Sequence, residues 1–258
     1  MDDQALIAQW QAEEQQPFQG WDFSYLKDRW HEAQPTWSYE MFVRTLLPEA
    51  DSVLDMGTGG GEKLLSFADA LPPNTIATEG YPPNLPVARA NLEAHGINVV
   101  PYDCGIDARL PFADNSLALV INRHEPYDAL EVARILRPGG AFLTQQVDGR
   151  DLADILSVFG GESAYLHVNL ATCQREVELA GLVVESAAEW AGTSSFSDIG
   201  ALVYYLHAAP WNAPDDFSVE RYVAQLLDLQ HQRRPFTFTT RRFYIQARKP
   251  TQRTSTEP

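Results

Sequence analysis

The sequence predicts an α/β fold in which a mainly parallel sheet has helices on both faces. A short apolar strand at 52–55 passes through a glycine cluster into a helical pattern at 63–68. Further strand-like and helical segments alternate along the chain as far as residue 148. The run at 116–121 is almost continuously apolar, as a central parallel strand buried on both faces requires. These observations favour a sheet built from strand–helix–strand units.

The composition bounds the size of the fold and the kind of partner. The chain has 258 residues, enough for one large domain, and 45% hydrophobic and 21% charged residues are typical of a globular protein. Its formal net charge is −16. Nucleic-acid binding depends on Lys and Arg side chains that neutralise phosphates. The charge therefore disfavours a large RNA or DNA partner without excluding a local basic patch.

Cysteine usage and hydropathy bound the compartment. Cys104 and Cys173 lie far apart and lack metal-ligand spacing, so neither a disulfide framework nor a metal site is expected. The N-terminus is acidic and no long apolar run follows it, so no signal peptide or transmembrane segment is predicted. We expect a cytoplasmic protein, monomeric or homodimeric, without a membrane partner.

Residues 1–48 are expected to form an aromatic, largely helical segment ahead of the main domain. Helical patterns at 5–15 and 37–47 flank a stretch that breaks at Pro17. Four of the six tryptophans lie in this segment: Trp10, Trp21, Trp30 and Trp37.

The short stretch at 20–25 has two interpretations. Its aromatic side chains could pack as a satellite core, or they could form a lid over a ligand, because aromatic faces suit cations and planar rings. Under the second interpretation Trp21 and Tyr25 are candidate substrate contacts.

The glycine cluster after the first strand predicts a nucleotide cradle. Glycines at this turn allow backbone conformations closed to other residues and let a ligand approach bare peptide groups. A dinucleotide fingerprint would need a third glycine where the chain has Glu62, so that cofactor class is disfavoured. Asp55, at the strand end, would repel a pyrophosphate but could meet an ammonium group.

The stretch resembles motif I of the class I S-adenosylmethionine-dependent methyltransferases, which is an acidic residue followed by x-Gly-x-Gly-x-Gly. Asp55, Gly57, Gly59 and Gly61 match it position for position, with Thr58 inside the turn. The resemblance implies a Rossmann-like sheet of seven strands in the order 3-2-1-4-5-7-6, with the last strand antiparallel. It also implies S-adenosylmethionine as cofactor, with its methionine end held at this turn.

The next two strands supply further candidate cofactor ligands. The strand at 75–80 ends in Glu79 and Gly80, at the spacing where a nucleotide fold places the acid that holds the ribose. The strand at 98–102 is followed by Asp103 and Cys104. Asp103 and Cys104 are the candidate adenine ligands, with Asp107 as an alternative to Asp103. In the family resembled, an acid in this region often meets the adenine amino group.

The strand at 116–121 ends in Asn122, Arg123, His124 and Glu125, the most reactive set of side chains in the sequence. Because open α/β sheets bind ligands beyond the carboxyl ends of their strands, this loop should border the transferable methyl group. Asn122 is expected to line the cofactor and Arg123 to contact substrate. His124 and Glu125 could act as general base and orienting acid, or could only position the acceptor.

The remaining chain continues the pattern. A helix at 128–136 is followed by Leu-Arg-Pro-Gly-Gly and a strand at 141–147, which again resembles class I methyltransferases, so that the resemblance covers about 50–148. The main domain is expected to span 49–250. A helical insert at about 197–232 would carry Tyr204 as a further candidate substrate contact. The other expected segments are a helix at 169–180, a strand at 182–187, a last strand within 236–247 and a disordered tail at 251–258.

The resemblance and the charge together predict direct in-line methyl transfer to a small-molecule acceptor. Two other functions remain open on the sequence. One is an RNA base methyltransferase, which would need a basic groove on the folded surface. The other is a cofactor-binding module that has lost catalysis and acts as a regulatory partner.

Overall fold

The computed structural model describes residues 2–18, 23–232 and 235–251, and its chain forms two compact units. The large unit consists of Trp37–Val147, Asn169–Glu189 and Phe243–Pro258. The small unit consists of Met1–Thr36, Asp148–Val168 and Trp190–Arg242. Two strands, β7 (Val183–Phe196) and β8 (Phe236–Arg248), contribute residues to both units. Each unit is described by itself.

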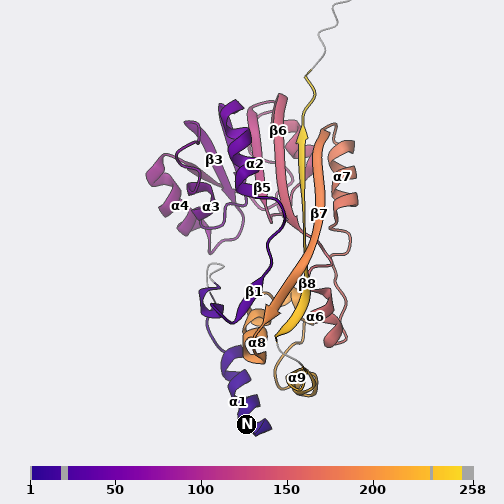
Figure 1. Ribbon diagram of the computed structural model, residues 1–258. Coiled ribbons are helices and arrows are strands. Elements are labelled where there is room, and N and C mark those ends of the chain that lie inside the picture. The colour runs from indigo at the N-terminus through magenta and orange to yellow at the C-terminus, as the bar shows by residue number, and fades with distance from the viewer. Residues whose placement is uncertain (1, 19–22, 233–234, 252–258) are drawn as a thin grey trace, which may run out of the picture. The chain divides into compact units, whose positions relative to one another are not determined.

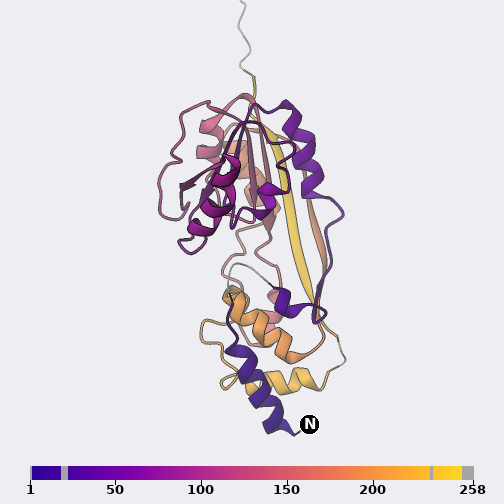
Figure 2. The same ribbon diagram turned by 90° about the vertical axis from the view of Figure 1, so that its left-hand side faces the viewer.

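The large unit holds the parallel sheet that the sequence predicts (Figure 1 and Figure 2). Its other strands are β2 (Ser52–Met56), β3 (Asn74–Glu79), β4 (Asn98–Pro101), β5 (Leu117–Arg123) and β6 (Leu136–Val147). The pairs β2–β3, β2–β5 and β5–β6 are parallel, with Leu54 opposite Val120 and Val120 opposite Phe142. All three side chains are fully buried, as strands covered on both faces require.

The strand order agrees with the expected Rossmann-like fold. Neighbouring strands follow the order β7-β8-β6-β5-β2-β3-β4, which is the predicted 3-2-1-4-5-7-6 sheet read from its other edge. At the end of β8 the Lys249 N–H donates to Gly140 O at 2.9 Å, and the Gly139 N–H donates to Lys249 O at 2.8 Å. The start of β6 therefore lies beside the end of β8, as an antiparallel last strand requires.

Helices cover the faces of this sheet. They are α2 (Tyr39–Leu46), α3 (Glu62–Leu65), α4 (Leu85–Leu92), α5 (Ala129–Ile135) and α7 (Leu170–Leu179), with the short 3₁₀ turns η2 (Leu47–Glu49) and η3 (Glu93–His95). Val43, Leu64 and Leu92 from α2, α3 and α4 pack in one core with the sheet residues Val53 and Leu119. Side-chain caps begin three of the helices: Ser38 before α2, Asp128 before α5 and Asn169 before α7.

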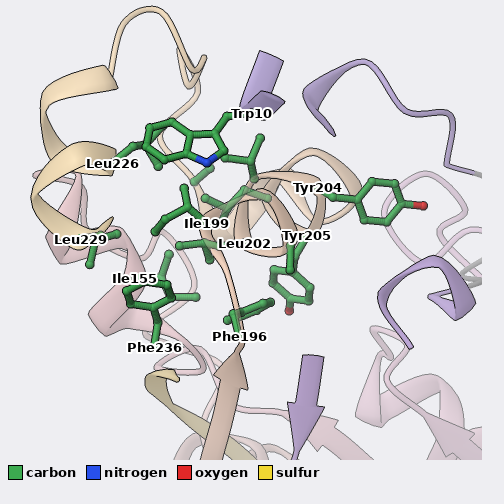
Figure 3. Close-up of a cluster of buried hydrophobic side chains, with 14 of the residues drawn as sticks. Trp10, Ile155, Phe196, Ile199, Leu202, Tyr204, Tyr205, Leu226, Leu229 and Phe236 are labelled. Atoms are coloured by element: carbon green, nitrogen blue, oxygen red, sulfur yellow. The ribbon is translucent and has the colours of Figure 1, made fainter. Parts of the chain in front are cut away.

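The small unit has its own hydrophobic core (Figure 3). Its elements are α1 (Asp3–Glu14), η1 (Ser24–Leu26), β1 (Trp30–Glu32), α6 (Ala153–Val158), α8 (Ile199–Ala208), η4 (Pro210–Asn212) and α9 (Val223–Gln230). The strand β1 pairs antiparallel with the end of β7, with Trp30 opposite Phe196. Trp10 from α1, Leu202 from α8 and Leu226 from α9 are buried together.

The structure differs from the expected organisation in several places. In the described residues the sheet has eight strands instead of seven, because β1 adds an edge strand. This strand has only three residues, too few to give a recognisable sequence pattern. The first boundary falls after Thr36 rather than 48, since α2 packs on the sheet core. The small unit also takes in 148–168, so the expected insert at 197–232 is only part of it.

Residues 137–140, expected to end a helix, lie within β6. The expected disordered tail at 251–258 lies, beyond Thr251, outside the described residues.

Candidate functional site

The glycine turn between β2 and α3 carries the predicted backbone conformations. Gly57, Gly59 and Gly61 have φ values of 67°, 62° and 87°. Gly57 must also lack a side chain, because a Cβ atom there would overlap the side chain of Glu125. The Thr58 N–H donates to Thr78 O of β3 at 2.8 Å, which fixes the turn to the sheet. The peptide groups of the turn are therefore held in place at the carboxyl edge of the strands.

Glu79, at the end of β3, is held by two backbone amides. Its Oε2 atom accepts from Gly59 N–H and its Oε1 atom accepts from Tyr81 N–H, each at 2.7 Å. Burial raises the pKa of this carboxyl, and the amide hydrogen bonds oppose that rise. Glu79 therefore links the glycine turn to the next loop, while each of its oxygens keeps capacity for a further donor.

Asp103 lies beside Gly80. A Cβ atom at Gly80 would come within 2.9 Å of Asp103 Cα, so the loops after β3 and β4 touch at this glycine. The carboxylate of Asp107 accepts from Asp103 N–H at 2.8 Å, which assigns Asp107 to holding the turn. Asp103 uses its Oδ1 atom to accept from Gly105 N–H at 2.8 Å. Of the two acids, Asp103 is the one that lies beside Gly80.

Cys104, the next residue, is partly buried, and burial raises the pKa of its thiol. The Tyr102 hydroxyl lies close enough to oppose that rise. Cys104 is therefore a neutral thiol at the edge of the loop, suited to packing against a ligand.

Asp55 is a buried carboxyl at the centre of the site. Burial raises its pKa to about 7, Glu79 adds to the rise, and Thr58 and Arg123 oppose it. The Thr58 hydroxyl influences this pKa although it makes no hydrogen bond of good geometry. The charge of Arg123 does not offset the effect of burial on this pKa. A ligand with a positive charge would therefore stabilise the ionised carboxyl.

Asn122, at the end of β5, is fully buried in a polar network. Its Oδ1 atom accepts from the Thr144 hydroxyl at 2.9 Å and from Gln146 Nε2 at 2.6 Å. The same Gln146 Nε2 donates to Glu125 O at 2.9 Å, so the network also fixes the loop after β5. The Asn122 Nδ2 atom is buried and has no hydrogen-bond partner. An unsatisfied buried donor of this kind is costly, and it fits a ligand that supplies an acceptor.

His124 and Glu125 occupy that loop. His124 has a φ of 63°, a left-handed conformation that is uncommon for residues other than glycine and is often found at functional sites. The Glu125 side chain lies over Gly57, and burial raises its pKa to about 7, with Glu79 and Asp103 adding to the rise. The loop thus places a carboxyl against the glycine turn and an imidazole next to it in sequence.

Residues 53–140, which run from β2 into β6 and include the glycine turn, match the family model for a methyltransferase domain. This part of the chain is therefore similar to methyltransferase domains.

One named relative is similar to part of the chain. Over 113 residues, 43% of this chain and 36% of the other, the chain is 32% identical to a protein from Micromonospora griseorubida named putative 23S rRNA (guanine-N(1)-)-methyltransferase. The match thus spans about a third of that relative's length.

Solved structures share the fold. One is of a putative methyltransferase from Bacillus halodurans, with a TM-score of 0.57 at 20% identity over 82% of this chain and 97% of that one. Another is of a functionally unknown protein from Deinococcus radiodurans, with a TM-score of 0.61 at 15% identity over 84% of this chain and 89% of that one.

The candidate substrate residues lie in different units. Tyr25 and Tyr204 contact each other in the small unit, with ring centroids 4.5 Å apart. Tyr204 is only 2% exposed, so it serves the core of that unit. Arg123 lies in the large unit, where its charge lowers the pKa of Asp55. Trp21 lies outside the described residues.

Sequence reasoning missed Tyr39, Thr144 and Gln146. The Tyr39 hydroxyl is buried without a hydrogen-bond partner, and the charge of Asp55 contributes to raising its pKa. Thr144 and Gln146 hold Asn122. A signal for the last two was present, because polar residues at 144–146 interrupt an otherwise apolar central strand. Tyr39 had no such signal, since a tyrosine on an amphipathic helix is ordinary.

The described part of the chain lacks two features, a membrane-spanning helix and a cluster of metal ligands. No helix in it is both long enough and apolar enough to cross a membrane. Its His, Cys, Asp and Glu side chains form no cluster of three or more suited to a metal ion.

Proposed function

We propose that this protein transfers the methyl group of S-adenosylmethionine to an acceptor by direct in-line displacement. The observation that carries the proposal is the glycine turn with two acids beside it: Asp55, whose carboxyl is buried, and Glu79, which is fixed by the Gly59 and Tyr81 amides. When bound, the cofactor supplies a methyl group on a sulfonium. A nucleophile attacks the methyl carbon while the carbon–sulfur bond breaks and its electron pair stays on sulfur.

The residues of this chain divide the binding between them. Asp55 would pair with the ammonium of the methionine end, which resolves its buried charge. Glu79 would accept from the ribose hydroxyls, and Asp103 would meet the adenine beside Gly80. Asn122 would donate from its unpartnered Nδ2 atom to the methionine end or the acceptor. Catalysis would then rest mainly on position, with the loop after β5 orienting the nucleophile.

Binding is tested by calorimetric titration with S-adenosylmethionine, S-adenosylhomocysteine and NAD. We expect both adenosyl ligands to bind and NAD not to bind. Asp55→Ala should abolish the binding, whereas Asp51→Ala should preserve it, because Asp51 carries the same side chain on the surface, paired with Arg137 at 2.7 Å. Binding of NAD alone, or equal binding by the Asp55 variant, would contradict the proposal.

A small molecule is the acceptor that the charge of the protein favours. The net charge is −16, and Asp55, Glu79, Asp103 and Glu125 gather at the carboxyl edge of the sheet. Such a site would repel the phosphates of a polynucleotide.

An RNA base is the second candidate acceptor, because the Micromonospora relative carries the name of an enzyme that acts on 23S rRNA. Methyl-labelled cofactor separates the two candidates. The protein is incubated with ribosomal RNA or with a fraction of small metabolites, and label is counted in each. Label in the metabolites supports a small-molecule acceptor, and label in RNA overturns it. Cofactor binding without label in either pool would indicate a non-catalytic binding module.

A further inference from the structure

Three side chains of the large unit form a hydrogen-bonded relay that ends at His124. The indole Nε1 of Trp37 donates to Gln145 Oε1 at 2.9 Å. The amide Nε2 of the same Gln145 lies 3.1 Å from His124 Nε2. Trp37 and Gln145 are 108 positions apart in sequence, so only the fold brings them together.

The direction of this relay follows from the chemistry of its first member. An indole N–H can donate a hydrogen bond but cannot accept one. Trp37 therefore requires the oxygen of the Gln145 amide, and the NH₂ group of that amide must face the imidazole. An amide NH₂ is a donor only, so the His124 Nε2 atom must be the acceptor, without a proton. The neutral ring then carries its proton on Nδ1.

The surroundings hold each member in place. Gln145 is 7% exposed, in the part of β6 next to the network around Asn122. The Trp37 ring packs edge-on against Tyr244, with centroids 4.9 Å apart, just ahead of the Ser38 cap of α2. The backbone N–H of His124 also donates to Gln145 O at 2.8 Å. His124 is thus fixed to Gln145 through both its backbone and its ring.

We propose that Trp37 and Gln145 are positioning residues that hold His124 as the Nδ1–H tautomer, with Nε2 occupied by the Gln145 amide. His124 in this state presents a hydrogen-bond donor at Nδ1. It cannot take up a proton at Nε2 without breaking the bond to Gln145, so it orients the acceptor rather than deprotonating it. This inference rests on the proposed methyltransferase function for its meaning in catalysis, whereas its test observes the imidazole directly.

The test is nitrogen NMR of the full chain with labelled histidine, at a pH where the rings are neutral. Long-range proton–nitrogen correlations distinguish a protonated ring nitrogen from an unprotonated one. The chain has six histidines, and the signals missing from a His124→Asn sample identify those of His124. We expect His124 to be protonated at Nδ1 and not at Nε2. Protonation at Nε2 in the unmodified protein overturns the proposal without any variant being needed.

Two variants test the relay itself. Gln145→Glu offers a carboxylate that still accepts from Trp37 but can only accept from the ring, so we expect the proton to move to Nε2. Trp37→Phe removes the indole N–H while keeping an aromatic ring, and it should let the Gln145 amide turn, giving a mixture of tautomers. Trp211→Phe, the same change at an exposed tryptophan of the small unit, should leave the His124 signals unchanged. An unchanged tautomer in Gln145→Glu contradicts the relay.

The outcome is independent of whether the methyl-transfer proposal holds. If calorimetry shows no S-adenosylmethionine binding while the Nδ1–H tautomer is found, the methyltransferase function fails and the relay stands. If the cofactor binds and the tautomer is the opposite one, the relay fails alone.

Discussion

The side chain of Glu125 lies against the α-carbon of Gly57, so that a Cβ atom at position 57 would overlap it. This contact joins the loop after β5 to the glycine turn after β2. Both φ strain and overlap therefore oppose any larger residue at position 57.

Gly57→Ala is expected to weaken S-adenosylmethionine binding far more than Gly59→Ala. The two glycines have nearly the same positive φ, 67° and 62°, so each alanine costs about 1–2 kcal/mol in backbone strain. Only Gly57 has neighbouring side-chain atoms, since nothing lies within 4 Å of a Cβ at Gly59. Calorimetric affinities of both variants measure the difference. Equal losses would mean that the Glu125 contact has no part in shaping the cradle.

Asp55→Asn is expected to stabilise the unliganded protein above neutral pH. The pKa of Asp55 is raised to about 7, so the native state binds this proton more tightly than the unfolded chain does. Its contribution to stability is full below about pH 4 and is lost as the pH rises to about 7. The loss approaches about 4 kcal/mol at most for a shift of this size.

Urea unfolding of the wild type and Asp55→Asn at pH 4.5 and pH 8 measures this effect. The advantage of the variant should be small at the lower pH and large at the higher one. Asp51→Asn, at a surface position, should show no gain in stability over the wild type between the lower and the higher pH. A constant difference between wild type and Asp55→Asn would contradict a raised pKa.

Cofactor affinity is expected to rise between pH 6 and pH 7.5. A bound ammonium favours ionised Asp55, and the charges around that carboxyl are those of Glu79 and Arg123. One group with a pKa near 7 weakens binding by about tenfold at pH 6. Titrations at the two pH values should show this change in the wild type and in Glu125→Gln, but not in Asp55→Asn if residual binding is measurable. A change that disappears in Glu125→Gln instead would assign it to Glu125, whose pKa is also raised to about 7.

Asn122→Asp is expected to weaken cofactor or acceptor binding while the protein still folds. The carboxylate can accept from Thr144 and Gln146 as the amide oxygen does, but the Nδ2 donor is lost. Thr144→Val is the matched control, since it deletes the two hydrogen bonds of the Thr144 hydroxyl, to Asn122 and from Gln146, each worth about 1 kcal/mol, and keeps Nδ2. Thermal unfolding and calorimetry separate the two effects. Similar affinities in both variants would exclude a ligand contact at Nδ2.

The large unit was largely predictable from sequence because its signals are local. The apolar run of β5 and the glycines after β2 each identify an element within about ten residues. Ordered along the chain, such elements leave few topologies for a parallel sheet. The acids at strand ends, Asp55 and Glu79, follow from the same rule, since parallel strands present their carboxyl ends at one edge.

The small unit and the relay were not predictable because they depend on distant pairs. The strand β1 has only three residues and exists through its pairing with Phe196 and its neighbours. From the sequence, Gln145 is an ordinary strand residue, and only the fold shows its hydrogen bonds to Trp37 and His124. Periodicity records which face of an element is buried, but it does not record which side chain from another part of the chain will contact it.

The pairing of β1 with the end of β7 also has a consequence for biosynthesis. The Trp30 indole donates to the Ser194 hydroxyl at 2.7 Å across 164 residues, and Arg29 pairs with Asp198 across 169. At about 5–20 residues per second of translation, β1 leaves the ribosome roughly 8–30 seconds before its partner strand. Most of the side chains that bury Trp10 and Leu26 are also synthesised long after these two residues. The strand β1 and the side chains of Trp10 and Leu26 therefore remain without these contacts until the end of β7 and α8 have been synthesised.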